Sequence, residues 1–287
     1  MQKYAFLFSF FAAVALVFTG CDSSDPAAAP EDPSTPDESA EETPAPAEPA
    51  EEPAAEAPAE EAAPNESAQE PAAAAEQSAA PADDGFIELF NGENLDGWTP
   101  SEENPDSFSV KDGVLVVKGG RSHLFYTGDV NGGTFTDFEL KVRAKTFPQA
   151  NSGVYFHTQF QAEGWPSNGY ECQVNSTHKD PKKTGSLYGV KNITVPVEGK
   201  PLPKGGDHDI RDAAPSTDGE WFDYHITVKG KHIVIRVNGE VTVDYTEPEE
   251  LPDGPFKGRK ISSGTFGIQA HDPDSEVHYE SWAVKPL

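Results

Sequence analysis

One segment of this chain lacks the side chains from which a protein core is built. Residues 22–84 consist mainly of Ala, Pro, Glu and Ser, with 12 prolines, no aromatic residue and no Val, Ile or Leu. Such a segment cannot bury enough apolar surface to offset the entropy lost on ordering. We therefore expect residues 21–84 to form a disordered acidic tether, which proline stiffens and like charges extend. A folded domain has to come from the residues that follow.

Charge and cysteine content exclude several functions. The chain has 49 Asp and Glu against 21 Lys and Arg, a net charge of −28, and 19 of the acids lie in residues 22–84, where Lys and Arg are absent. Nucleic acid is not expected as a partner, because neutralising phosphates requires a basic surface. The only cysteines are Cys21 and Cys172. This excludes a disulfide scaffold and a zinc site built on several thiolates.

The first 20 residues resemble a bacterial lipoprotein signal peptide. Residues 1–3 carry the positive charge of Lys3, residues 4–18 are apolar except for Ser9, and Thr-Gly precedes Cys21. The apolar run is too short for a comfortable membrane span. The resemblance implies cleavage before Cys21, lipidation of its thiol, and an exported protein that is anchored to the membrane of the bacterial cell envelope. The alternative is an ordinary signal peptide followed by an incidental cysteine.

From residue 85 onward the sequence has the pattern of short antiparallel strands. Residues 138–144 alternate apolar and charged side chains, as a half-buried strand requires. Residues 224–228, 232–237 and 241–245 predict a meander, and Asn238-Gly239 at its second turn is the preferred pair for a two-residue hairpin. Sustained helical periodicity is absent. The pattern predicts one all-β domain over residues 85–287, either a sandwich or a barrel.

Three predicted strands place polar side chains on one face. Within residues 151–160, alternation directs Tyr155 and His157 to one face, and Phe156 and Phe160 to the other. In residues 169–175 and 267–271 the polar side chains that share a face are Glu171, Gln173, Asn175, Gln269 and His271. If the strands are neighbours, these groups form a patch typical of a sugar-binding groove. The alternative is a solvated surface, because one face of an antiparallel sheet commonly faces water.

A long segment rich in loop-forming residues follows the second of these strands. Residues 177–220 contain several prolines and the pair Gly205-Gly206. Loops of this length inside a compact domain are usually functional or disordered. We expect this insertion to wall a binding site, in which Tyr155, Tyr188 or Trp165 could stack on a sugar ring.

Seven short motifs occur in order along the predicted domain. They are residues 86–92 with 95–98, 151–156, 169–174, 184–188, 219–221, 237–239 and 267–271. In this order they resemble the 3-keto-disaccharide hydrolase domain family. The resemblance implies a concanavalin-like, laminarinase-like antiparallel β-sandwich (a jelly roll) with a concave carbohydrate face. It also implies hydrolysis of glycosides that are oxidised at the 3-position of the sugar.

The chain departs from this family at two positions. The family often has Arg where this chain has His157, and a Phe-Arg-Asn run where this chain has Tyr279-Glu280-Ser281. Both changes remove a guanidinium group that could bind substrate.

The chemistry of a 3-keto sugar suits the predicted polar residues better than ordinary glycoside hydrolysis does. Ordinary glycosidases place two carboxyls around the scissile bond, whereas Glu171 shares its face with Gln173 and Asn175. In a 3-keto sugar the C2 proton is acidic and the oxygen on C1 is a leaving group, so one base and one acid suffice. We expect Glu171 or His271 as the base, and His157 or Tyr188 as the acid.

Other residues of the predicted site would bind the substrate. We expect Gln173 and Gln269 to bind the carbonyl or hydroxyl groups, with Tyr155, Tyr188 and Asn151 as further substrate-binding residues. No cofactor motif is clear, but a divalent cation such as calcium could stabilise an enolate. The main alternative is a non-catalytic carbohydrate-binding module of the cell envelope, and a third hypothesis is a structural envelope protein whose polar face binds another protein.

Overall fold

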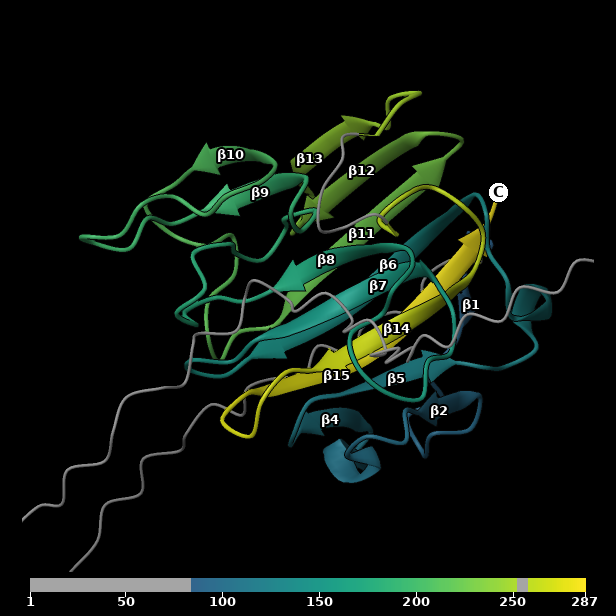
Figure 1. Cartoon of the computed structure of the whole chain (residues 1–287). Coiled ribbons are helices and arrows are strands. Elements are labelled where there is room, and N and C mark those ends of the chain that lie inside the picture. The colour runs from purple at the N-terminus through teal and green to yellow at the C-terminus, as the bar shows by residue number, and fades with distance from the viewer. Residues whose placement is uncertain (1–83, 252–257) are drawn as a thin grey trace, which may run out of the picture. The chain divides into compact units, whose positions relative to one another are not determined.

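The computed structural model describes residues 84–251 and 258–287, and these are coloured in Figure 1. The signal peptide and all but the last residue of the tether lie outside the described residues, so both stay predictions. Within the described part of the chain, no helix has the length and apolar character needed to cross a membrane.

The larger of two antiparallel sheets has eight strands. Their order is β13-β12-β11-β6-β15-β4-β3, and β1 also pairs with β15 (Figure 1). The strands are β1 (Ile87–Glu88), β3 (Phe108–Lys111), β4 (Val114–Lys118), β6 (Phe138–Thr146), β11 (Phe222–Lys229), β12 (His232–Val237), β13 (Glu240–Thr246) and β15 (Glu276–Pro286).

The smaller sheet has five strands in the order β2-β5-β14-β7-β8. They are β2 (Trp98–Pro100), β5 (Ser122–Tyr126), β7 (Ser152–Thr158), β8 (Tyr170–Val174) and β14 (Thr265–Ala270). Strands β14, β7 and β8 are therefore neighbours, as the predicted polar patch requires (Figure 1). The sequence alone could not establish this adjacency, because about 90 residues separate β8 from β14 in the chain.

The remaining regular elements are short. Two 3₁₀ turns, η1 (Pro105–Ser107) and η2 (Val130–Gly133), lie between strands in the first third of the domain. Strands β9 (Lys191–Thr194) and β10 (Asp207–Ile210) pair in parallel within the insertion at residues 177–220. The insertion thus has a small sheet of its own.

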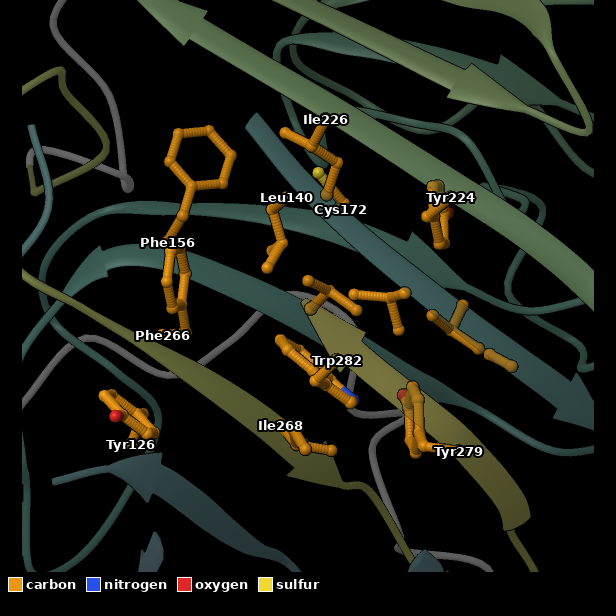
Figure 2. Close-up of a cluster of buried hydrophobic side chains, with 14 of the residues drawn as sticks. Tyr126, Leu140, Phe156, Cys172, Tyr224, Ile226, Phe266, Ile268, Tyr279 and Trp282 are labelled. Carbon is orange, nitrogen blue, oxygen red and sulfur yellow. The ribbon is translucent and has the colours of Figure 1, made fainter. Parts of the chain in front are cut away.

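The hydrophobic core lies between the two sheets. Trp98 of the smaller sheet packs edge-to-face on Trp282 of the larger sheet, with ring centroids 5.3 Å apart. Phe138 likewise contacts Phe156 at 5.7 Å. Figure 2 shows Phe156 and Trp282 among the core side chains, together with the buried thiol of Cys172. The predicted all-β sandwich is confirmed, and Cys172 is a core residue.

Local sequence patterns predicted many strands correctly. Strand β6 alternates buried and half-buried residues along its whole length. The meander is β11, β12 and β13, and Asn238 and Gly239 at its second turn both have positive φ, 51° and 83°. Those angles are what a two-residue hairpin requires, and Asn and Gly tolerate them best.

Alternation fails at the end of β7, and two predictions that relied on it are wrong. His157 has a φ of 57°, which turns its ring away from the face of Tyr155 and onto Phe138, with centroids 5.7 Å apart. Strand β7 ends at Thr158, so Phe160 no longer follows the pleat. Its side chain is 46% exposed instead of lying in the core.

Candidate active site

The outer face of the five-stranded sheet forms the floor of the candidate site. Two rows of outward-facing residues cross strands β5, β14, β7 and β8 in turn. The first row is His123, Gln269, Gly153 and Gln173, and the second is Phe125, Gly267, Tyr155 and Glu171. We call His123, Glu171, Gln173, Gln269 and His271 the polar cluster. The first four are each less than 5% exposed, so this face is not a solvated surface.

Glu171 is held at the centre of this face by charged and neutral donors. Its Oε2 accepts a hydrogen bond from Nη2 of Arg259 at 3.3 Å, and its Oε1 accepts from Nε2 of Gln269 at 3.3 Å. The same amide nitrogen donates to the hydroxyl of Tyr155 at 3.0 Å. Because a carboxylate is only an acceptor, this network fixes the Gln269 amide with its Oε1 pointing away from Glu171.

A glycine makes the contact between Glu171 and Gln269 possible. The two side chains belong to β8 and β14, and they meet across Gly153 on the intervening strand β7. A Cβ at position 153 would lie 2.5 Å from Oε1 of Glu171. Any side chain there would displace the carboxylate, so Gly153 is part of the site.

A chain of hydrogen bonds also fixes the orientation of Gln173. The backbone N–H of Asp180 donates to Nδ1 of His178 at 3.1 Å, so this nitrogen is an acceptor. The amide of Asn151 lies 3.3 Å from the same nitrogen and therefore presents its NH₂ group to it. Oδ1 of Asn151 then accepts from Nε2 of Gln173 at 3.0 Å. The result is that Oε1 of Gln173 points away from Asn151.

His271 and Asp272 form a hydrogen-bonded pair at the end of β14. Nδ1 of His271 lies 2.7 Å from Oδ2 of Asp272. Burial acts to raise the pKa of Asp272, but hydrogen bonds from His271 and Ser275 and from the backbone of Asp274 hold it below its usual value. The ionised carboxylate orients the imidazole with its proton on Nδ1, which leaves the lone pair of Nε2 directed into the site.

His123, which was not among the predicted site residues, lies on β5 beside Gln269. Its ring contacts Tyr155 and Trp165, with centroids 5.5 and 5.6 Å away. Burial, aided by the positive charge of Arg121, lowers the pKa of His123 to about 3, so the ring is neutral near pH 7. The alternation of residues 122–126, with Leu124 and Tyr126 in the core, is the signal that could have revealed it.

The polar cluster contains buried polar atoms without a hydrogen-bond partner. They are Oε1 of Gln173, Oε1 of Gln269, Nε2 of His271 and both ring nitrogens of His123. An unsatisfied buried polar atom costs about 1–3 kcal/mol, and native structures seldom keep several together. The two amide oxygens, Nε2 of His271 and one nitrogen of neutral His123 are acceptors, and the other nitrogen of His123 is a donor. This set complements a ligand with several hydroxyl groups and one carbonyl.

Residues from outside the sheet cover the polar cluster. Arg259 lies over the ring of Tyr188 at 4.9 Å and donates to its carbonyl, and Lys182 lies over the same ring at 4.0 Å. Tyr188 also donates its hydroxyl to Oδ2 of Asp180 at 3.1 Å. The insertion therefore walls the site, as predicted. A separate cavity of about 290 Å³ lies between β9, β10 and β13 and includes no residue of the polar cluster.

Two predicted polar residues lie outside the polar cluster. The ring of His157 accepts the backbone N–H of Ser262 at Nδ1 (3.3 Å) and bonds the carbonyl of Thr136 through Nε2 (2.8 Å). His157 therefore anchors the segment that carries Arg259, and its place outside the cluster argues against a role as the acid. Asn175 lies beyond the end of β8, and its amide donates to the carbonyls of Asp180 and Lys182.

The two departures from the family pattern do not remove groups from the polar cluster. His157 lies outside it, and Glu280 belongs to β15 in the other sheet, where its Oε2 pairs with Nε of Arg143 at 2.7 Å. Arg259 supplies a guanidinium to the site from the segment before β14, and no sequence pattern indicated this.

Three side chains near the cluster could contribute metal ligands. The candidate ligand atoms of His178, His271 and Asp272 all lie within 4.8 Å of one another. Two imidazoles and one carboxylate suit a transition metal, whereas calcium requires six to eight oxygens, so calcium is a poor match for these three side chains. Moreover, Nδ1 of His178 accepts a hydrogen bond, so the ring carries its own proton on Nε2. Nε2 is also the ring nitrogen that faces Asp272, 4.0 Å from its Oδ2. His178 would have to lose that proton to bind a metal, so the fit is incomplete and the chemistry below uses the protein groups alone.

Comparisons with known proteins place this geometry in context. Residues 85–285 match the sequence profile of the 3-keto-alpha-glucoside-1,2-lyase-like domain. No curated protein sequence gives a significant match. A crystal structure from Parabacteroides distasonis ATCC 8503, provisionally named a glycosyl hydrolase, has a TM-score of 0.52 and 23% identity over 71% of this chain and 94% of its own. That likeness supports the fold.

Two further solved structures are similar at a lower level. A second crystal structure from Parabacteroides distasonis ATCC 8503, also provisionally named a glycosyl hydrolase, has a TM-score of 0.48 and 24% identity, covering 70% of this chain and 99% of its own. A carbohydrate-binding module of Bacillus subtilis has a TM-score of 0.44 and 12% identity, covering 66% and 95%.

Proposed function

This chain belongs to the 3-keto-alpha-glucoside-1,2-lyase-like domain family, and we propose that it cleaves glycosides whose sugar is oxidised at the 3-position. The observation that carries the proposal is the set of buried, unpartnered polar atoms in the polar cluster. A keto sugar offers hydroxyl donors for the two glutamine oxygens and one carbonyl acceptor for an N–H of His123. Such a ligand would satisfy the atoms that the protein leaves unsatisfied.

His271 is the better of the two predicted bases. Nε2 of its ring is buried and unpartnered, and Asp272 holds the ring in the tautomer that has its lone pair on Nε2. Glu171 instead has one oxygen bonded to Arg259 and the other to Gln269. Charge-assisted donors stabilise a carboxylate and so weaken it as a base. We assign proton abstraction from C2 to His271, and positioning of Gln269 and Arg259 to Glu171.

The reaction is an elimination across C1 and C2. Nε2 of His271 takes the C2 proton, the electron pair of that bond forms the C1–C2 double bond, and the C1–O bond breaks. The glycosidic oxygen then takes that proton from Nε2 and leaves as an alcohol, which returns His271 to its neutral state. The ketone at C3 delocalises the developing charge onto its oxygen. A neutral imidazole can stabilise that oxygen by donating its N–H, which is the role we assign to His123. Later addition of water across the double bond completes net hydrolysis.

The carboxyl groups of the site do not suit the mechanism of an ordinary glycosidase. That mechanism needs one protonated carboxyl and one free carboxylate around the scissile bond. Glu171 is bonded to Arg259 and Gln269, and the low pKa of Asp272 keeps it ionised. The proposal therefore requires an oxidised sugar as substrate.

Product analysis tests the proposal directly. The purified domain is incubated with a 3-keto disaccharide and with the same disaccharide unoxidised. We expect only the keto form to release its second sugar. Release from neither substrate, together with retention on immobilised polysaccharide, would instead support the non-catalytic carbohydrate-binding module.

The site of action is also part of the proposal. We propose that the protein is exported and lipid-anchored at Cys21, since residues 1–21 resemble a lipoprotein signal and processing site. Replacing Cys21 by Ser should leave the precursor without lipid and shift the protein out of the detergent phase. An unchanged distribution would contradict the anchor.

A further inference from the structure

The floor of the site continues from the polar cluster onto an aromatic surface. Phe125 follows His123 on the outer face of β5 and is fully buried, because Phe160 covers it with ring centroids 5.6 Å apart. Trp165 also contacts the ring of His123, at 5.6 Å, and the ring of His271, at 5.5 Å. We call Phe125, Phe160 and Trp165 the aromatic shelf.

The loop that carries Phe160 and Trp165 is fixed to the sheet. Within the loop, Nε2 of Gln161 donates to the carbonyl of Trp165 at 2.7 Å. Oε2 of Glu103 accepts the backbone N–H of Gly164 at 2.9 Å, and its Oε1 pairs with Arg121. The guanidinium of Arg121 in turn lies over the Trp165 ring at 5.4 Å. The shelf is therefore preformed and does not depend on a ligand for its order.

The aromatic shelf and the other side of the site differ in charge. Beside β8, Glu171 is accompanied by Arg259, Lys182 and Asp180 around Tyr188. Beside β5, the charges of Arg121 and Glu103 neutralise each other, and the exposed surface is the ring of Phe160, 46% exposed. Ligand sites are commonly lined by hydrophobic and aromatic side chains beside a few polar groups.

We infer that the aromatic shelf binds the leaving group, and that an apolar aromatic alcohol is preferred there over a small aliphatic alcohol. The inference rests on the proposed function, because it places the oxidised sugar on the polar cluster. His123 and Phe125 are adjacent outward positions of one strand, about 7 Å apart. A group attached to C1 of a sugar bound at His123 and His271 therefore reaches the shelf directly. An aromatic ring there would cover Phe160 and lie against Trp165.

A matched pair of substrates tests this inference. The 3-keto glucosides of 2-phenylethanol and of ethanol have leaving groups of similar acidity and differ by one phenyl ring. Covering the exposed part of Phe160 with that ring removes on the order of 50 Å² of apolar surface, which favours the phenylethyl substrate by about tenfold in kcat/KM. Replacing Phe160 with Ser should reduce this preference to about twofold. Leu202→Ser is the control, because Leu202 is exposed to the same degree, 47%, and lies in the insertion.

Calorimetric binding of the two unoxidised glucosides separates failure of this inference from failure of the proposed function. If neither keto glucoside is cleaved but the phenylethyl glucoside binds more tightly, and Phe160→Ser abolishes the difference, the shelf stands and the proposed reaction fails. If both keto glucosides are cleaved at equal efficiency, the inference is overturned while the reaction stands. A preference that Phe160→Ser leaves intact would also overturn the inference.

Discussion

The outer faces of the two sheets are both polar, but the polar groups of one ion pair are exposed on the larger sheet and those of another are buried on the smaller sheet. On the larger sheet, Arg143 pairs with Asp223 at 3.1 Å, and both side chains are well exposed. On the smaller sheet, Glu171 pairs with Arg259 at 3.3 Å, and its side chain is only 5% exposed. All but two of the residues with buried, unpartnered side-chain atoms in the described part of the chain belong to the polar cluster, and none lies on the outer face of the larger sheet.

This difference distinguishes a surface that water solvates from one that, under the proposed function, binds a ligand. Exposed ion pairs contribute little to stability, because water screens them and solvates either partner alone. Buried polar atoms without partners reduce stability, so a fold keeps them only where another molecule or ordered water completes them. Polar alternation alone predicts both faces equally well, and only burial and hydrogen bonding distinguish them.

The largest expected effect comes from one histidine on each face. His271→Gln removes the proposed base and should lower kcat on a 3-keto glycoside by on the order of 10²–10⁴-fold. His225 also bonds a carboxylate, Glu139 at 2.8 Å, but on the outer face of the larger sheet. His225→Gln should leave kcat unchanged. Equal activity of the two variants in steady-state assays would show that His271 is not the base.

The next effect concerns the glycine beneath Glu171. In Gly153→Ala, the added Cβ displaces Oε1 of Glu171 from Gln269, and we expect kcat/KM to fall by on the order of 10–100-fold. The control is Gly267→Ala, whose Cβ would meet its neighbours at an ordinary 3.5 Å. Both variants should melt within a few degrees of the wild type, since the displaced atoms are the ends of side chains. Full activity in Gly153→Ala would show that the Glu171–Gln269 contact is dispensable.

Charge removal at the two ion pairs should give unequal losses of stability. Glu171→Gln leaves Arg259 without its carboxylate in a buried place, which should cost about 2–3 kcal/mol in the free energy of unfolding. Asp223→Asn removes an exposed partner of Arg143 and should cost less than about 1 kcal/mol. Denaturant unfolding measures both. We also expect Glu171→Gln to lower kcat by only about tenfold, because it positions other groups; a loss as large as that of His271→Gln would make Glu171 the base.

The pH dependence of stability should reveal the buried histidines. Burial, followed by repulsion from His271, lowers the pKa of His178 to about 4, and the pKa of His123 is about 3. The unfolded chain takes up protons below about pH 6.5 while these folded rings stay neutral. The free energy of unfolding should therefore fall as the pH falls from about 6.5 to 4, by about 1.4 kcal/mol per pH unit for each ring. His123→Gln should remove the contribution of one proton from the slope of the unfolding free energy against pH. An unchanged slope would show that His123 titrates normally in the fold.

The sequence predicted many strands and much of the polar face because alternation is a local property. Glu171, Gln173, Gln269 and Tyr155 lie together on one face because each strand keeps its pleat and the three strands are neighbours. The prediction failed for His157, because a single positive φ at the strand end turned the ring to the other side. No local sequence pattern indicates a positive φ at position 157.

Contacts between distant segments could not be predicted. Arg259 reaches Glu171 from 88 positions away, and the orientation of Gln173 depends on a backbone N–H of the insertion. These contacts orient the amides of Gln173 and Gln269, and only that orientation leaves their oxygens without a hydrogen-bond partner. The face could thus be predicted as polar, but not as buried and incomplete.

One measurement tests the central claim, that the polar cluster removes the C2 proton of an oxidised sugar. A 3-keto disaccharide labelled with deuterium at C2 is cleaved by the wild-type enzyme in ordinary water, and the sugar product is analysed by mass spectrometry. Abstraction by His271 predicts that the label passes to water in every turnover, with a slower rate than for the unlabelled substrate, and that the unoxidised disaccharide stays intact. Cleavage with the deuterium retained at C2, or equal cleavage of the unoxidised disaccharide, would contradict the account.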